Sequence, residues 1–367
     1  MQIARGLDLT YCTNIHPAEG WPAVFANLEK YAPALKGALA PDAPFGIGLR
    51  LSAAEARELL DGDRLERLRD FLESRGLYVA LINGFPYGFF HGAPVKETVY
   101  APDWRDPARV EYTLDLAHIL QVLLPHGMDG GVSTAPLSYK PWNADLAPMA
   151  RNVAQVGEAL ARIHHETGKF IHLDIEPEPN CVLENTDETI AFFDRADVPR
   201  DYIQVCFDCC HFAVEYEDPI AAIARLKRAG IRIGRVQLSS ALRMPAGARP
   251  DRLRPFAESV YLHQTIAKCN GGLQRFADLE EALAARPDGC EWRIHFHVPL
   301  FTSEYEHFKS TQDYVRTVIE AAQYDSVTTH LEIETYTWDV LPGDLKVDLL
   351  DSIRREYEWV LSCTRPR

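Results

Sequence analysis

The segment "TTHLEIETYTWDVLP", residues 328–342, carries three ionisable side chains at alternate positions of an apolar run. Successive side chains of a β-strand point to opposite faces, so His330, Glu332 and Glu334 share one face while Leu331 and Ile333 share the other. The segment therefore predicts a strand with one apolar face and one ionisable face. In the folded protein, the charges of the ionisable face need to be compensated.

Several other segments show the same alternation. In "FIHLDIEPEP", residues 170–179, polar positions alternate with Leu173 and Ile175. In a parallel barrel the apolar face contacts the surrounding helices and the polar face lies inside. The residues expected to face inward are His172, Asp174 and Glu176; Gln204, Cys206, Asp208 and Cys210; Arg235, Gln237 and Ser239; Arg293, His295 and His297; and Arg50 with Ser52.

Short apolar strands alternate with longer helical patterns along the chain, which indicates parallel pairing through right-handed crossovers. The number of units favours an α/β fold of the (β/α)8 TIM-barrel type over a doubly wound sheet, because no Gly-x-Gly-x-x-Gly turn follows a strand. Residues 1–367 are expected to form a single TIM-barrel domain. Candidate strands cover residues 8–14, 45–52, 78–85, 130–136, 170–179, 202–210, 233–240, 292–300 and 329–336, so one of them should lie outside the barrel.

The longest interval between candidate strands runs from residue 241 to 291. Its segment "YLHQTIAKCNGGLQRFADL" predicts a β-hairpin, inserted near residues 255–280, with its turn at Asn270, Gly271 and Gly272. Such an insertion is expected over the mouth of the barrel.

Composition limits the classes of function. The content is 47% hydrophobic and 25% charged, as in ordinary globular proteins. The formal net charge of -15 argues against binding of nucleic acid, whose phosphates attract clustered Lys and Arg. No secretory signal pattern or membrane-spanning apolar run is recognised, so the protein is expected to be soluble and cytoplasmic, with no membrane insertion and with reduced cysteines.

Three carboxylates are predicted near the carboxyl ends of their strands: Glu176, Asp208 and Glu334. Burying them together costs several kcal/mol each unless their charge is compensated. A divalent cation, Mn²⁺, Mg²⁺, Zn²⁺, Co²⁺ or Fe²⁺, would compensate it, with His297 or His295 adding a neutral nitrogen. The alternative is a set of buried ion pairs with Arg50, Arg235 or Arg293. His172 and His295 are also compatible with purely structural roles.

Further residues are candidates for the substrate-binding mouth. Asn14 and His16 follow the first predicted strand. The loop "NGFPYGFFHG", residues 83–92, contains aromatic residues, including Phe85 and Tyr87, that would form an apolar wall.

The motifs "LDIEPEPN", "FDCCH" and "HLEIET" resemble the xylose-isomerase-like superfamily of metal-dependent TIM barrels. The additional motifs "YCTNIHPAEGW", "INGFPYGFFHG", "VKETVYAPDW", "RIHFHVPLF" and "LEIETYTW" are similar to the EboE family of metabolite-traffic proteins, which is grouped with that superfamily.

The resemblance implies that Glu176, Asp208 and Glu334 are metal ligands and that Glu176 and Glu334 transfer protons across the substrate. It also implies that His211 contacts substrate hydroxyls and that Arg243 binds substrate. The superfamily usually has a histidine ligand where this chain has Gln237. Either Gln237 ligates through its carbonyl oxygen, or His297 provides the nitrogen, or the site is incomplete.

These patterns favour a metal-dependent isomerase or epimerase acting on a small-molecule polyol, either a sugar or a cyclitol. Two other hypotheses stand beside it. One is a metal-dependent phosphoesterase of the endonuclease IV type, against which the negative charge argues. The other is a non-catalytic metabolite-binding protein.

Overall fold

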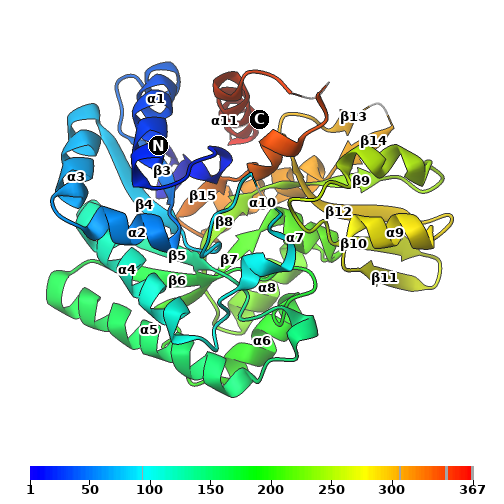
Figure 1. Cartoon of the computed structure of the whole chain (residues 1–367), viewed down its shortest axis with the longest axis horizontal. Coiled ribbons are helices and arrows are strands. Elements are labelled where there is room, and N and C mark those ends of the chain that lie inside the picture. The colour runs from blue at the N-terminus through cyan, green and yellow to red at the C-terminus, as the bar shows by residue number, and fades with distance from the viewer. Residues whose placement is uncertain (93, 306, 344–345, 365–367) are drawn as a thin grey trace.

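A ring of parallel strands forms the centre of the computed structural model, which describes residues 1–92, 94–305, 307–343 and 346–364 (Figure 1). Within the described residues the main sheet has the order β1-β2-β15-β8-β7-β6-β5-β4-β3, in which β1 (Gln2–Ala4) pairs antiparallel with β2. A parallel bridge between Cys12 and Gly48 joins the two ends of the ring. The barrel strands are β2 (Leu7–Tyr11), β3 (Phe45–Arg50), β4 (Leu77–Asn83), β5 (Gly130–Thr134), β6 (Ile171–Ile175), β7 (Ile203–Asp208), β8 (Ile233–Leu238) and β15 (His330–Ile333).

Helices surround this ring, which confirms the (β/α)8 TIM barrel. Several begin at residues whose side chains bond to the first turn, such as Ser52, which forms a capping box with Glu55 at the start of α2. The C-terminal helix α11 packs against α1, next to the N-terminus (Figure 1). The outer helices are α1 (Trp21–Leu39), α2 (Ala53–Leu60), α3 (Arg64–Arg75), α4 (Pro107–Leu123), α5 (Leu146–Thr167), α6 (Thr186–Arg195), α8 (Pro219–Arg228), α10 (Gln312–Asp325) and α11 (Leu349–Thr364).

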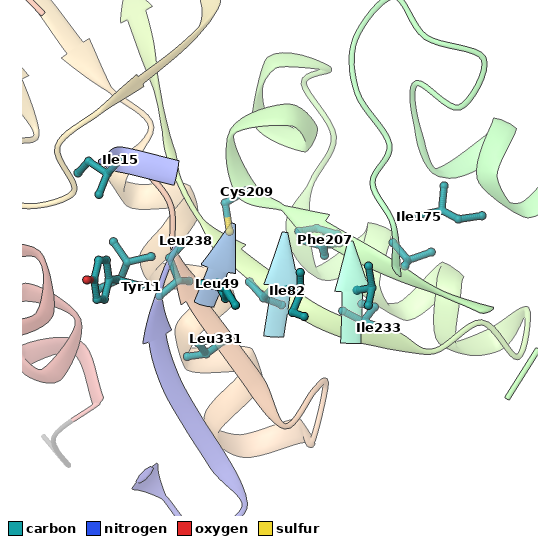
Figure 2. Packing of buried hydrophobic residues seen from close by; sticks show 14 of the residues in the cluster. Tyr11, Ile15, Leu49, Ile82, Ile175, Phe207, Cys209, Ile233, Leu238 and Leu331 are labelled. Atoms are coloured by element: carbon teal, nitrogen blue, oxygen red, sulfur yellow. The ribbon is translucent and has the colours of Figure 1, made fainter. Parts of the chain in front are cut away.

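The apolar faces of the barrel strands form the hydrophobic core. Leu331 and Ile333 on β15 are almost completely buried, as expected for the face opposite the ionisable residues. Figure 2 shows such side chains on several strands, among them Leu49, Ile82 and Leu331. Because this face packs against helices, the alternate residues of each strand are directed into the barrel interior.

The predicted strand at residues 292–300 is the candidate that lies outside the barrel. It forms β12 (Glu291–Val298), which pairs antiparallel with β9 and β10 in a second sheet. The expectation that Arg293, His295 and His297 project from a barrel strand is therefore wrong. Parallel and antiparallel strands share the same two-residue periodicity, so the pattern could not separate them.

The second sheet extends from the barrel, together with the short helix α9 (Leu279–Ala285), on the right of Figure 1. The predicted hairpin is present as β10 and β11, whose last pair is Cys269 with Gly272. It is part of a larger sheet in the order β11-β10-β12-β9-β14-β13. Its strands are β9 (Ser240–Met244), β10 (Thr265–Cys269), β11 (Gly272–Phe276), β12, β13 (Glu304–Tyr305) and β14 (Phe308–Ser310).

A disulfide between Cys269 and Cys290 connects the end of β10 to the residue before β12. The expectation of reduced cysteines is wrong for this pair, because the hairpin brings together two residues that lie 21 positions apart in the sequence. Six other cysteines are free and buried. None of the described helices combines the length and apolar character that crossing a membrane requires.

Candidate metal centre

Three carboxylates meet at the carboxyl end of the barrel. Glu176 directly follows β6, Asp208 ends β7 and Glu334 directly follows β15. One oxygen atom from each lies within 4.8 Å of the others, and all three residues are buried. Parallel strands end at the same rim of a barrel, and this brings together residues that are up to 158 positions apart.

The arginines that could neutralise these carboxylates are engaged elsewhere. Arg235 bonds to Asp174 at 2.9 Å and to Glu332 at 3.1 Å, which form the layer one step deeper in the barrel. Arg50 pairs with Glu55, and Arg293 pairs with Glu291 beside it. In the part of the chain that the structure describes, Glu176, Asp208 and Glu334 have no ion pair with Lys or Arg. The buried ion pairs of Arg235 therefore belong to the layer below the three carboxylates.

Burial and mutual repulsion act on the protonation of the group. The pKa of Glu176 is raised well above its usual value by burial and by the charge of Asp208. Burial and the charge of Glu176 raise the pKa of Glu334 in the same way. Burial also opposes ionisation of Asp208, but His211, His297 and a hydrogen bond from Ser239 outweigh it and lower its pKa. A cation would favour ionisation of all three.

Unpartnered atoms around the carboxylates fit such a cation. Glu176 Oε2, Asp208 Oδ2 and His297 Nε2 are buried and have no hydrogen-bond partner among the described residues. The Nδ1 atom of His297 lies 2.8 Å from a backbone carbonyl oxygen and must donate to it, which leaves the lone pair on Nε2 free. Carboxylate oxygens with one imidazole nitrogen form a donor set for Mg²⁺, Mn²⁺, Zn²⁺, Co²⁺ or Fe²⁺.

Two asparagines hold the carboxylate of Glu334. Asn14 and Asn83 donate to Glu334 Oε1 at 2.8 and 3.0 Å. Asn14 lies in the 3-10 helix η1 (Thr13–Ile15) after β2, and Asn83 ends β4. Sequence reasoning selected Asn14 as a mouth residue and missed Asn83. The terminal position of Asn83 on a predicted strand was the signal available for it.

A second polar network borders the carboxylates and was also missed. Glu178 Oε1 accepts hydrogen bonds from Tyr100 at 2.8 Å and from Gln264 at 3.1 Å. His295 Nδ1 donates to Gln264 Oε1 at 2.7 Å, and His211 Nδ1 donates to a backbone carbonyl. Glu178 follows Glu176 by two positions, so the strand alternation pointed to it. Gln264 directly precedes β10 of the second sheet, and no pattern in the sequence connected it with the site.

A pocket lined by Glu176 and Glu334 lies at this end of the barrel, with an empty volume of about 530 Å³ that includes open solvent. Its walls combine the polar groups with aromatic residues from loops and from the 3-10 helix η5 (Tyr336–Val340). Among the predicted mouth residues, Asn14, Phe85 and His211 line it. The described lining residues are Asn14, Asn83, Phe85, Pro86, Phe90, Val95, Lys96, Val99, Tyr100, Glu176, Glu178, His211, Tyr261, Leu262, His295, His297, Glu334 and Tyr336.

Four candidate residues lie away from this cavity. His16 stacks on Tyr31. Tyr87 packs edge to face against Tyr112. Arg243 pairs with Asp313 at 3.3 Å at the start of α10. Gln237 is buried inside the barrel, where its Oε1 accepts a hydrogen bond from the thiol of Cys206.

Comparisons with known proteins agree on the fold. A TIM-barrel protein from Mycobacterium smegmatis in complex with magnesium is 12% identical, with a TM-score of 0.53 over 99% of this chain and 98% of that chain. A D-tagatose 3-epimerase-like protein is 11% identical, with a TM-score of 0.53 over 98% of each chain. The IOLI protein with a bound zinc atom is 13% identical, with a TM-score of 0.52 over 98% of this chain and 100% of that chain.

The search among curated proteins found no match. The family model for the xylose isomerase-like TIM barrel matches residues 46–289, which include β3 to β11 and two of the three clustered carboxylates. This chain therefore belongs to the xylose isomerase-like TIM barrel family.

Proposed function

We propose that this protein is a metal-dependent isomerase or epimerase that acts on a sugar or a cyclitol. One observation carries the proposal: Glu176, Asp208 and Glu334 converge, Asp208 also forms a group of possible ligands with His211 and His297, and no arginine or lysine pairs with the three carboxylates in the described chain. The magnesium, zinc and D-tagatose 3-epimerase-like descriptions of the similar structures support the metal and the substrate class.

Different residues of the site would hold the cation and transfer protons. A cation held by Glu176, Asp208, His297 and Glu334 would supply the positive charge that stabilises an enediolate as it develops on the substrate. Burial and mutual repulsion raise the pKa of both Glu176 and Glu334, and a bound cation would act in the opposite direction. One glutamate then removes the carbon-bound proton of the substrate and the other returns it.

The lining of the cavity favours an unphosphorylated polyol. Lys96 is the cationic residue among the described lining residues, and its ammonium already pairs with Asp278 at 2.5 Å. A phosphate group would therefore find no unpaired lysine or arginine among the described lining residues. Asn14, His211 and Tyr336 supply hydrogen-bonding groups for hydroxyls, and aromatic walls suit the apolar faces of a sugar ring.

Several narrower statements belong to the same proposal. The net charge of -15 disfavours a phosphoesterase acting on nucleic acid. A single domain over the whole chain and membership in the EboE family are proposed from the sequence motifs and composition. A cytoplasmic location is proposed on the same basis, although the disulfide between Cys269 and Cys290 is of a kind that is rare in reducing compartments. A metabolite-carrier role is the alternative to the enzyme.

Proton exchange with solvent tests the enzyme against the carrier. Purified protein would be incubated in deuterated water with a panel of sugars and cyclitols, and deuterium in the recovered substrate would be measured. We expect incorporation with the natural protein and loss of at least about a hundredfold in Glu176→Gln and Glu334→Gln. Glu304→Gln, whose carboxylate is exposed on β13, is the matched control. Binding of a polyol without any exchange would instead establish a carrier.

A further inference from the structure

A second group of metal-ligating side chains lies at the opposite end of the barrel. Asp129 directly precedes β5, His172 is the second residue of β6, and His330 is the first residue of β15. One ligand atom from each lies within 4.8 Å of the others. The amino ends of parallel strands meet at one rim, so this group is separated from the mouth by the deeper layer of Asp174 and Glu332 with Arg235.

His172 is held in the orientation of a metal ligand. Its Nδ1 atom lies 2.6 Å from Asp174 Oδ1, and Arg235 donates to the other oxygen of Asp174 at 2.9 Å. Nδ1 donates to this carboxylate, so Nε2 is the nitrogen available to an ion. This nitrogen is buried, has no hydrogen-bond partner among the described residues and faces Asp129 Oδ2 at 3.9 Å. A carboxylate that fixes the far nitrogen is the usual support of a metal-binding histidine.

Asp129 and His330 complete the group. His330 Nε2 lies 3.3 Å from Asp129 Oδ1 and donates to the backbone carbonyl oxygen of Asp129 at 3.1 Å, and Thr329 donates to Asp129 Oδ2 at 3.0 Å. An ion bound to this nitrogen would replace its hydrogen bond to the carbonyl. His330 is also buried, and its Nδ1 lacks a hydrogen-bond partner in the described chain. Asp129, with a third of its side chain exposed, lines an outer cavity through which an ion and water can reach the group.

The neighbouring strand leaves space for this arrangement. A Cβ atom at Gly234 would lie 2.6 Å from His172 Nδ1 and 2.0 Å from Asp174 Oδ1. Any side chain at this position would displace the pair, so the glycine of β8 keeps room for the imidazole and its supporting carboxylate.

We propose that Asp129, His172 and His330 bind a second divalent cation, Zn²⁺ or a similar borderline ion, at the amino-terminal rim of the barrel. Two imidazole nitrogens and one carboxylate oxygen are a zinc donor set, and a water from the outer cavity completes the coordination. The ion connects β5, β6 and β15, so its binding stabilises the closed ring. The competing arrangement is a direct ion pair of Asp129 with protonated histidine, which needs no metal.

Zinc titration of the full chain separates these arrangements. Protein stripped with a chelator would be titrated with Zn²⁺ alone by calorimetry, using the double variant Asp208→Asn with Glu334→Gln to remove the mouth site. We expect this variant to retain one zinc equivalent and to show a higher Tm with zinc. Adding Asp129→Asn should weaken the remaining binding by about tenfold or more. Asp325→Asn, an exposed carboxylate lining the same outer cavity, should leave it unchanged.

Two outcomes would overturn the proposal. One is the absence of stoichiometric zinc binding in the mouth variant, and the other is unchanged affinity after Asp129→Asn. If either combined variant fails to fold by circular dichroism, Co²⁺ titration of the natural protein gives the answer. The natural protein should bind two equivalents of Co²⁺, one at each site, and His330→Gln alone should bind one. Binding of two equivalents by His330→Gln would also contradict the site.

Discussion

The Nδ1 atom of His297 lies 2.8 Å from the backbone carbonyl oxygen of Glu334. The contact connects β12 of the second sheet to the end of β15 in the barrel. A carbonyl oxygen can only accept, so His297 donates through Nδ1 and leaves Nε2 without a hydrogen-bond partner among the described residues. The second sheet thereby brings an imidazole to Asp208 and His211, and one ligand atom of each of these three residues lies within 4.8 Å of the others.

His297→Gln should weaken metal binding at the mouth by about tenfold or more, because a ligand nitrogen is lost while the carboxylates remain. Zinc calorimetry of Asp129→Asn protein, with and without His297→Gln, would measure the mouth site alone. His164→Gln, which changes a partly buried histidine bonded to Tyr202, serves as the control. Equal affinities in all three proteins would exclude His297 as a ligand.

Arg235→Ala should lower the free energy of unfolding by about 3–5 kcal/mol, because it leaves Asp174 and Glu332 buried without their cation. Arg232→Ala is the matched control. Arg232 pairs with Asp201 at 2.9 Å on the surface, where such a pair contributes about 1 kcal/mol or less. Urea denaturation would compare the two variants. Similar losses would show that the layer of charges inside the barrel is not what stabilises it.

Gly48→Ala should destabilise the barrel by about 2 kcal/mol or more, because the new Cβ would meet Glu332 Oε1 at 1.8 Å and the backbone oxygen of Tyr11 at 3.0 Å. Gly37→Ala provides the contrast, since Gly37 is exposed in α1 and nothing lies within 4 Å of its added Cβ. That change should stabilise by about 0.5–1 kcal/mol through helix propensity. Thermal unfolding measures both, and a harmless Gly48→Ala would refute the close packing.

Glu356 on α11 should make stability fall as the pH rises. Burial raises the pKa of Glu356 from 4.5 to about 7, although Thr335 and the amide of Leu300 donate hydrogen bonds to its carboxylate. The folded state therefore holds an extra proton between these two values, and above pH 7 the full penalty of ionisation applies.

Glu356→Gln should remove this penalty, which amounts to at most about 3 kcal/mol. Urea denaturation at about pH 5 and about pH 8 should show a smaller loss of stability with rising pH in this variant than in the natural protein. Glu358→Gln on the exposed side of the same helix should behave like the natural protein. An identical pH dependence in all three proteins would refute the raised pKa.

Alternation along the strands was enough to predict the barrel and its three carboxylates. Each barrel strand has one face toward helices and one toward the interior, and this arrangement appears in the sequence as apolar and polar residues that alternate with a period of two. Glu176, Asp208 and Glu334 were found because they end such strands. The same reasoning assigned β12 to the barrel, because the period does not depend on the direction of the partner strand.

The sequence by itself therefore determined the class of fold, the inward faces of the strands and the residues at their carboxyl ends, because these follow from local periodicity. Only the tertiary structure decided which groups meet. It placed His297 over the mouth from a second sheet, directed Arg235 to Asp174 and Glu332, and left Arg243 and His16 away from the cavity. The positions of these side chains depend on contacts between segments far apart in the chain, and such contacts produce no periodic pattern in the sequence.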